Sequence, residues 1–230
     1  MLLKRRQVLV GLAALPAAAV ASSLTVPHAA ATDADRALLD AAIAGVPGTQ
    51  EVITVAAPSF TSTDVQVSAW AGLAQGWTKV YGPVPGKVGS EGIGEGKDDV
   101  PRTPFGVFRL DQAFGRQDNP GTAMPYTKVT DQHWWDGNVN SPTYDRMVTQ
   151  AASPGPGSEN LYTTGPMYDY AVHFDNNPTH TPGKGGAMFL HVTDGQPTLG
   201  CVAISREGMI TLLTWLSPAF TPVLVTGLSS

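Results

Sequence analysis

His191 and Cys201 are the two residues of this sequence best suited to covalent chemistry. Cys201 is the only cysteine among 230 residues, and His191 lies ten positions before it. Residues 187–191 and 202–204 are apolar enough to form two short strands, and the turn residues of 194–197 allow the chain to double back between them. The sequence therefore predicts a hairpin that places the imidazole beside the thiol.

A thiol beside an imidazole is suited to acyl transfer. A free cysteine titrates near ~8.5, and a neighbouring histidine lowers that pKa so that thiolate is present at neutral pH. Gly200 allows the backbone to turn tightly before the nucleophile, and the N–H groups of Gly200 and Cys201 are candidates for an oxyanion hole. The alternative is a buried structural cysteine beside a core histidine, which composition alone favours.

Residues 1–31 have the pattern of an export signal. A basic start precedes the apolar stretch 8–21, which is too short to span a bilayer, and three alanines form a cleavage site at the end. Arg5 and Arg6 fit either a twin-arginine signal or an ordinary secretory signal. We expect the mature protein in the periplasm, the cell wall or the extracellular space. Structural cysteines pair into disulfides there, so an unpaired Cys201 favours a reactive thiol.

The remainder of the chain reads as short strands separated by turn signals, which indicates an all-β sandwich or barrel with one or two helices. We expect an N-terminal helix or arm over 32–50 and one catalytic domain over 51–230. A long surface loop is predicted over 82–101. The expected helices are 33–44 and the segment that Ser205 caps, and the expected strands are 51–56, 64–70, 77–81, 105–110, 168–174, 187–191, 202–204 and 222–226.

Composition and the positions of other side chains argue against several functions. The net charge is -5, with no basic patch, so nothing indicates nucleic acid, and no membrane span follows the signal. His173, His180 and His191 match no compact zinc motif, so we expect no metal and no cofactor. His173 is instead expected as a core or groove residue that could touch substrate. Trp134 and Trp135 either line a substrate groove or, as we prefer, pack beneath a long loop.

Two motifs give the chain a resemblance to a known family. His191 ends a predicted strand and is followed by Thr-Leu-Gly-Cys-Val at 198–202, and residues 102–108 contain Thr-Pro-Phe-Gly-Val-Phe. In this order the motifs resemble those of the L,D-transpeptidases of bacterial cell walls, the YkuD-domain family, and the likeness extends over roughly residues 51–226. Leu199 and Ala203 depart from the residues that many members carry, and the His-to-Cys spacing is short for the family. These departures concern substrate contacts and leave the nucleophile and base in place.

The resemblance implies a mostly β fold, a β-sandwich of mixed sheets with one or two α-helices. It also implies a peptidoglycan L,D-transpeptidase, in which Cys201 attacks a tetrapeptide donor stem, His191 acts as base, and the backbone of Gly200 and Cys201 holds the oxyanion. Thr198 and His173 would contact the stem peptide, and carbapenems would acylate Cys201. With water as acceptor the enzyme would be an L,D-carboxypeptidase. Without activity it would be a wall-binding module.

Overall fold

The computed structural model describes residues 31–229. The predicted export signal lies outside these residues, apart from its last one. The helices are α1 (Asp33–Gly45) and α2 (Arg206–Trp215), with 3-10 turns η1 (Pro166–Tyr168) and η2 (Pro218–Phe220). The strands are β1 (Glu51–Ala57), β2 (Asp64–Leu73), β3 (Gly76–Lys87), β4 (Ile93–Gly94), β5 (Thr103–Pro104), β6 (Gly106–Gly115), β7 (Tyr126–Lys128), β8 (His133–Asp136), β9 (Arg146–Thr149), β10 (Glu159–Asn160), β11 (Ala171–Asp175), β12 (Phe189–Val192), β13 (Val202–Ile204) and β14 (Val223–Leu228).

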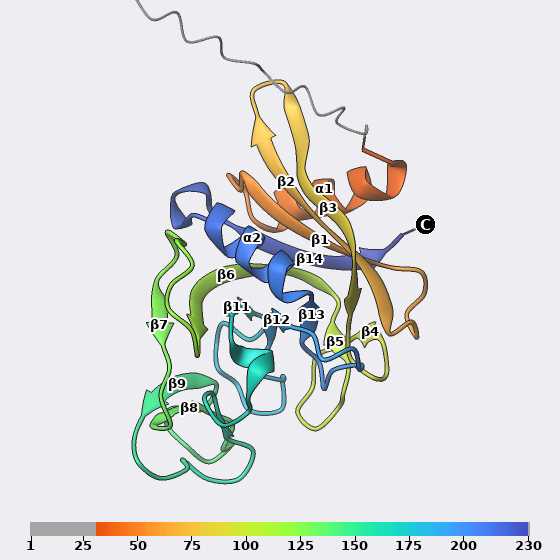
Figure 1. Ribbon diagram of the computed structural model, residues 1–230. Coiled ribbons are helices and arrows are strands. Elements are labelled where there is room, and N and C mark those ends of the chain that lie inside the picture. Colours follow the sequence, from red (N-terminus) through yellow and green to blue (C-terminus); the bar gives the residue numbers. More distant parts are fainter. Residues whose placement is uncertain (1–30, 230) are drawn as a thin grey trace, which may run out of the picture.

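A single mixed sheet forms the body of the protein. Its strand order is β11-β12-β13-β3-β2-β1-β14-β6-β7, and β11 also pairs with β6. The sheet therefore closes on itself into a barrel-like core (Figure 1). The pairs β1–β14, β12–β13 and β6–β7 are parallel, and the other pairs are antiparallel. The predicted mostly β class, with mixed sheet pairing and two α-helices, is confirmed.

The barrel interior and one face of α2 share the main hydrophobic core. Ile53 and Val55 of β1 belong to the same buried cluster as Met209 and Leu213 of α2, and all four are fully buried. Ser205 caps the helix as predicted, because its side chain accepts a hydrogen bond from the Gly208 N–H. The helix follows β13 directly, so its burial fixes the strand that comes after Cys201.

The N-terminal helix α1 covers the outer face of the same sheet. Thr32 and Asp35 form a capping box at its start, which agrees with the predicted helix boundary. Leu38, Leu39 and Ala42 are buried in a second cluster that contains Val52, Trp70, Val223 and Val225 of the sheet. The apolar spacing of Leu38, Leu39 and Ile43 predicts one shared helix face, but Ile43 is 43% exposed. Strand β1 is therefore buried on both of its faces.

Two local predictions are wrong. Residues 82–87 extend β3 rather than opening a long loop, because Val84 and Gly86 continue the antiparallel ladder with β2. Strands β12 and β13 are parallel and do not form a hairpin. After the predicted turn, the backbone of Thr198 hydrogen-bonds to the backbone of Val88 and Ser90 and not to β12. The chain must therefore turn a second time before β13 begins.

A smaller sheet projects from the barrel next to its open end. It has the order β10-β8-β9 and lies away from α1 (Figure 1). Trp135 of β8 is buried in a third cluster with Phe114, Tyr168 and Phe189, and Cys201 belongs to the same cluster. Between residues 31 and 229 no helix is long and apolar enough to cross a membrane.

Candidate active site

His191 and Cys201 line one cavity of about 1150 Å³. Its walls come from the loop before β5, the β8–β9 connection, the segment from β10 to η1, and the loop between β12 and β13. The parallel register of β12 and β13 places His191 opposite Ala203. His191 and Cys201 therefore reach one cavity through neighbouring parallel strands and not through a hairpin.

Cys201 lies directly before β13, with 9% of its surface exposed. Its Sγ accepts a hydrogen bond from the Phe189 N–H at 3.4 Å. The thiol donates to the backbone carbonyl of Ala187, with 3.5 Å between sulfur and oxygen. Both partners belong to the strand that carries His191 or to its approach, so one stretch of backbone fixes nucleophile and base together.

His191 is held by backbone and by an aromatic ring. Its Nδ1 lies 2.9 Å from the Val192 carbonyl oxygen, so the neutral ring carries its proton on Nδ1 and has Nε2 free to accept one. The Val192 carbonyl therefore orients the imidazole. The ring of Tyr168 packs edge-on against the imidazole at 5.5 Å. Burial lowers the pKa of His191, which keeps the imidazole neutral and able to act as a base.

The expectation that His191 lowers the pKa of Cys201 is wrong here. Burial, together with the nearby Glu159 carboxyl, raises the pKa of the thiol to about 12, although the Phe189 N–H acts in the opposite direction. Desolvation disfavours both the thiolate and the imidazolium. The cavity therefore holds a neutral thiol and a neutral imidazole.

The turn before Cys201 is fixed by Thr198. The Thr198 hydroxyl donates to the Cys201 carbonyl at 2.6 Å and accepts from the Gly200 N–H at 3.1 Å. Gly200 has φ 144°, a backbone conformation that residues with a Cβ rarely adopt, so glycine is favoured here. The Gly200 N–H, one of the two predicted oxyanion donors, therefore already donates to Thr198. The other, the Cys201 N–H, bonds to no side chain of residues 31–229.

The upstream motif contacts the nucleophile through Thr103. Its hydroxyl donates to the Cys201 carbonyl at 3.1 Å and accepts from the Gly89 N–H at 2.9 Å. Thr103 is fully buried and lies 98 positions before Cys201. The sequence singled out this motif through the family resemblance, but gave no sign that its threonine fixes the backbone of the nucleophile.

His173 and His180 lie apart from the two catalytic candidates. His173 is 2% exposed and does not line the cavity. Its Nδ1 lies 2.8 Å from Oδ1 of Asp111, and its ring packs at a tilt of 38° against Trp135, with 4.6 Å between ring centroids. His180 lies 3.7 Å from the buried carboxylate of Asp145. No group of three or more His, Cys, Asp or Glu side chains in the described part of the chain is arranged to bind a metal ion. Trp135 packs against Phe189 of β12, and it also forms part of the cavity wall.

Sequence reasoning missed three side chains of the cavity wall: Asp145, Glu159 and Tyr168. The Tyr168 hydroxyl donates to Glu159 at 2.8 Å, and burial raises the pKa of that carboxyl. Asp145 accepts hydrogen bonds from the Trp135 indole and the Ala187 N–H, both at 2.9 Å. None of the three stands in a motif, because each acts on a part of the chain that only the fold brings near.

The L,D-transpeptidase catalytic domain (YkuD) family model matches residues 80–225. This span contains the upstream motif, His191 and Cys201. No curated protein and no solved structure is significantly similar to the chain.

Proposed function

The chain belongs to the L,D-transpeptidase catalytic domain family, and we propose that it is a peptidoglycan L,D-transpeptidase that acts outside the cytoplasm with Cys201 as its nucleophile. The observation that carries the proposal is the joint placement of Cys201 and His191 in one cavity, with the imidazole oriented by the Val192 carbonyl so that Nε2 can accept a proton. The cavity is large enough for a stem peptide, since small-ligand sites measure roughly 300–1,000 Å³.

The first half of the reaction forms a thioester. The thiol proton, which is donated to the Ala187 carbonyl at rest, is transferred to Nε2 of His191. At the same time the sulfur attacks the carbonyl carbon of the third residue of the donor stem. The Cys201 N–H is the donor available to the resulting oxyanion. When the intermediate collapses, the bond to the terminal D-Ala breaks, and its amine leaves with the proton from His191. Neutral starting forms suit this step, because the charge appears only during the reaction.

The second half regenerates the thiol. The side-chain amine of an acceptor stem attacks the thioester carbonyl, His191 takes a proton from that amine, and the thiol leaves with the proton. One amide bond has then replaced another, and the net reaction needs no oxidant or cofactor. Water in place of the amine would release a tripeptide, which is the carboxypeptidase alternative, and a domain that performs neither step would be a wall-binding module. Thr198 lines the cavity and is retained as a candidate substrate contact.

Muropeptide analysis tests the proposal directly. Purified protein is incubated with disaccharide-tetrapeptide and the products are analysed by mass spectrometry. A cross-linked dimer supports the transpeptidase, a trimmed tripeptide supports the carboxypeptidase, and unchanged substrate supports the binding module. Cys201→Ala is expected to abolish the product, whereas the melting temperature should change little because only one small side chain is truncated. Turnover by Cys201→Ala within a few-fold of wild type would contradict the mechanism.

Carbapenem acylation gives a second test that needs no acceptor. A strained β-lactam presents an acyl group that Cys201 can open, so we expect one added ligand mass on the intact protein and none on Cys201→Ser. Ala203 and Leu199 replace residues that many relatives carry, and Leu199 is 85% exposed at the cavity rim, so saturation by the inhibitor is expected to be weak. Protein that reacts with iodoacetamide but forms no carbapenem adduct would favour the binding module.

A further inference from the structure

We propose that Asp145 is a positioning residue for the nucleophile, because its buried carboxylate holds the backbone of Ala187, whose carbonyl in turn holds the Cys201 thiol. The kinetic part of the test rests on the proposed function, whereas the chemical part does not. The contacts form a short chain from the β8–β9 connection, through the approach to β12, to the sulfur.

The contacts that carry this inference are all hydrogen bonds. Oδ1 of Asp145 accepts from the Ala187 N–H at 2.9 Å, across 42 positions of the sequence. The Ala187 carbonyl accepts the thiol proton of Cys201, with sulfur 3.5 Å from oxygen. Because the N–H and carbonyl belong to the same residue, a shift of Ala187 moves one of the two polar partners of the sulfur. The other partner, the Phe189 N–H, lies two residues further along the chain.

The backbone at this point does not adopt its conformation without help. Ala187 has φ 56°, in the left-handed region that costs a residue with a Cβ about 1 kcal/mol or more. Residue 186 is glycine, and a Cβ there would lie 2.4 Å from Oδ1 of Asp145, so the carboxylate and the backbone are in close contact. A strained residue persists only where its surroundings fix it. At Ala187 the carboxylate of Asp145 supplies that constraint.

Asp145 is itself held firmly. It is 2% exposed, its own φ is 59°, and its N–H donates to the Asp136 carbonyl at 2.6 Å. Its Oδ1 also accepts from the Trp135 indole at 2.9 Å. Thr143 supports the same loop, since its hydroxyl donates to the Asp136 carboxylate at 2.6 Å. The small sheet that carries these residues therefore presents one carboxylate to the strand of the catalytic base.

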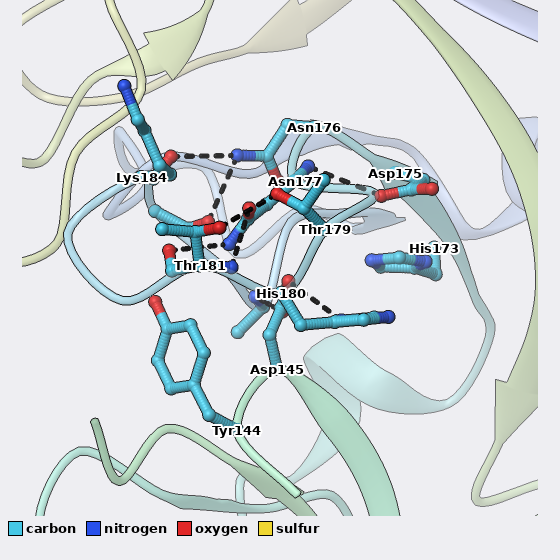
Figure 2. Close-up of polar contacts among 12 residues, drawn as sticks. Tyr144, Asp145, His173, Asp175, Asn176, Asn177, Thr179, His180, Thr181 and Lys184 are labelled. Atoms are coloured by element: carbon cyan, nitrogen blue, oxygen red, sulfur yellow. Dashed lines mark hydrogen bonds and ion pairs between the residues drawn. The ribbon is translucent and has the colours of Figure 1, made fainter. Parts of the chain in front are cut away.

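The two oxygens of the Asp145 carboxylate have different surroundings. Figure 2 shows Asp145 beside His180, which belongs to the loop that leads toward β12. Oδ2 is buried and lies 3.7 Å from Nδ1 of His180, too far for a hydrogen bond, whereas Oδ1 accepts two bonds. Substitution by asparagine can keep the acceptor at Oδ1 and remove the charge. The holding function is thus separable from any charge effect on His180.

Four variants test the assignment: Asp145→Ala, Asp145→Asn, Thr143→Ala and His180→Gln. Asp145→Ala is expected to lower kcat on the order of 10- to 100-fold with little change in KM, because the substrate still binds but the sulfur is misplaced. Asp145→Asn should recover most of the lost kcat. Thr143→Ala loosens the same loop without touching Ala187, and His180→Gln removes only the neighbour of Oδ2, so both should keep kcat near that of wild type.

Alkylation by iodoacetamide gives a readout that needs no peptidoglycan substrate. The bond to the Ala187 carbonyl favours the neutral thiol, so Asp145→Ala should be alkylated several-fold faster at pH 9, while Asp145→Asn and Thr143→Ala follow wild type. If Thr143→Ala reacts as fast as Asp145→Ala, the effect is loss of local stability and the proposal is wrong. The proposal is equally wrong if Asp145→Asn loses as much kcat as Asp145→Ala. It is also wrong if Asp145→Ala raises KM without lowering kcat. An inactive wild type with the expected alkylation pattern would overturn the proposed function and leave this assignment standing.

Discussion

The Cys201 thiol and the His191 imidazole are both buried, and burial moves their pKa values in opposite directions. It raises the pKa of the thiol to about 12 and lowers the pKa of the imidazole, so each side chain is neutral at pH 7. A neutral thiol is a weak nucleophile, so the folded protein should react slowly with general thiol reagents. In the proposed mechanism, attack by the sulfur therefore requires transfer of the thiol proton to His191.

We expect this neutral pair to be visible in the pH dependence of alkylation. The rate of reaction of Cys201 with iodoacetamide should still be rising at pH 10, since the thiolate fraction grows toward a pKa of about 12. The same protein in denaturant provides the control, with a midpoint near ~8.5 for a free thiol. A folded-state midpoint at or below 7 would mean that thiolate and imidazolium form a stable pair, which contradicts the arrangement described above.

The proposed nucleophile and base were identified in the sequence by residue type and by the order of the motifs. Cys201 is the only cysteine, and if the chain is exported as its first 31 residues predict, an unpaired cysteine indicates a reactive thiol. The supporting side chains could not be predicted in the same way. Asp145 bonds to Ala187 across 42 positions of the sequence, and Thr103 bonds to Cys201 across 98. Contacts at such separations produce no periodic or local pattern in the sequence.

Elements with local signals were predicted close to their true bounds. Helix α2 begins at Arg206 behind the Ser205 cap, and α1 begins at Asp33 behind a Thr32 capping box. The relation of β12 to β13 was predicted wrongly, because turn residues show where a chain reverses and not which strand it pairs with afterwards. In this fold the backbone of Thr198 bonds to the backbone of Val88 and Ser90 and not to β12. The chain then turns again, and β13 runs parallel to β12.

Strand β1 contains a buried carboxyl that should make stability depend on pH. Burial raises the pKa of Glu51 to about 7, and its carboxyl accepts from the Ser217 N–H at 2.8 Å. The folded protein keeps this proton to about pH 7, whereas the unfolded chain releases it near 4.5. The stabilising contribution is therefore full below pH 4.5 and is lost as the pH rises through 7.

Glu51→Gln should remove that dependence. The amide oxygen of glutamine can still accept from Ser217, so at pH 8 the variant should exceed wild type in the free energy of unfolding by on the order of 2 kcal/mol. At pH 4.5 the two proteins should melt at nearly the same temperature. Melting curves at both pH values check this, and an equal difference at the two pH values would show that ionisation of Glu51 is not the cause.

Closure of the sheet is the feature of the whole molecule that sequence patterns predicted least well. Alternating strands indicated a sandwich or a barrel, but the pairing of β11 with both β12 and β6 joins segments far apart in the chain. The same closure brings the loops of the cavity together at one end, while α1 covers the sheet elsewhere (Figure 1). The division of the chain into an arm over 32–50 and a catalytic domain over 51–230 stays a prediction.

Helix α1 should contribute to stability without contributing to catalysis. Leu39 is only 1% exposed and belongs to the same buried cluster as Val52, Trp70 and Val225. No residue of α1 lines the cavity. Leu39→Ala is expected to lower the free energy of unfolding by about 2–5 kcal/mol through a cavity under the sheet, and Ile43→Ala, at an exposed site of the same helix, by about 0.5 kcal/mol or less.

Below the melting temperature, Leu39→Ala should retain the kcat and the iodoacetamide reactivity of wild type. Denaturant unfolding followed by tryptophan fluorescence reports the stability, and assays at 15–20 °C below the measured transition, a margin of roughly 4 kcal/mol or more, report the site. Loss of kcat in a fully folded Leu39→Ala protein would mean that the packing of α1 reaches Cys201 through the strands of the barrel. The arm and the cavity would then be one cooperative unit, and the separation of helix α1 from the catalytic site would be wrong.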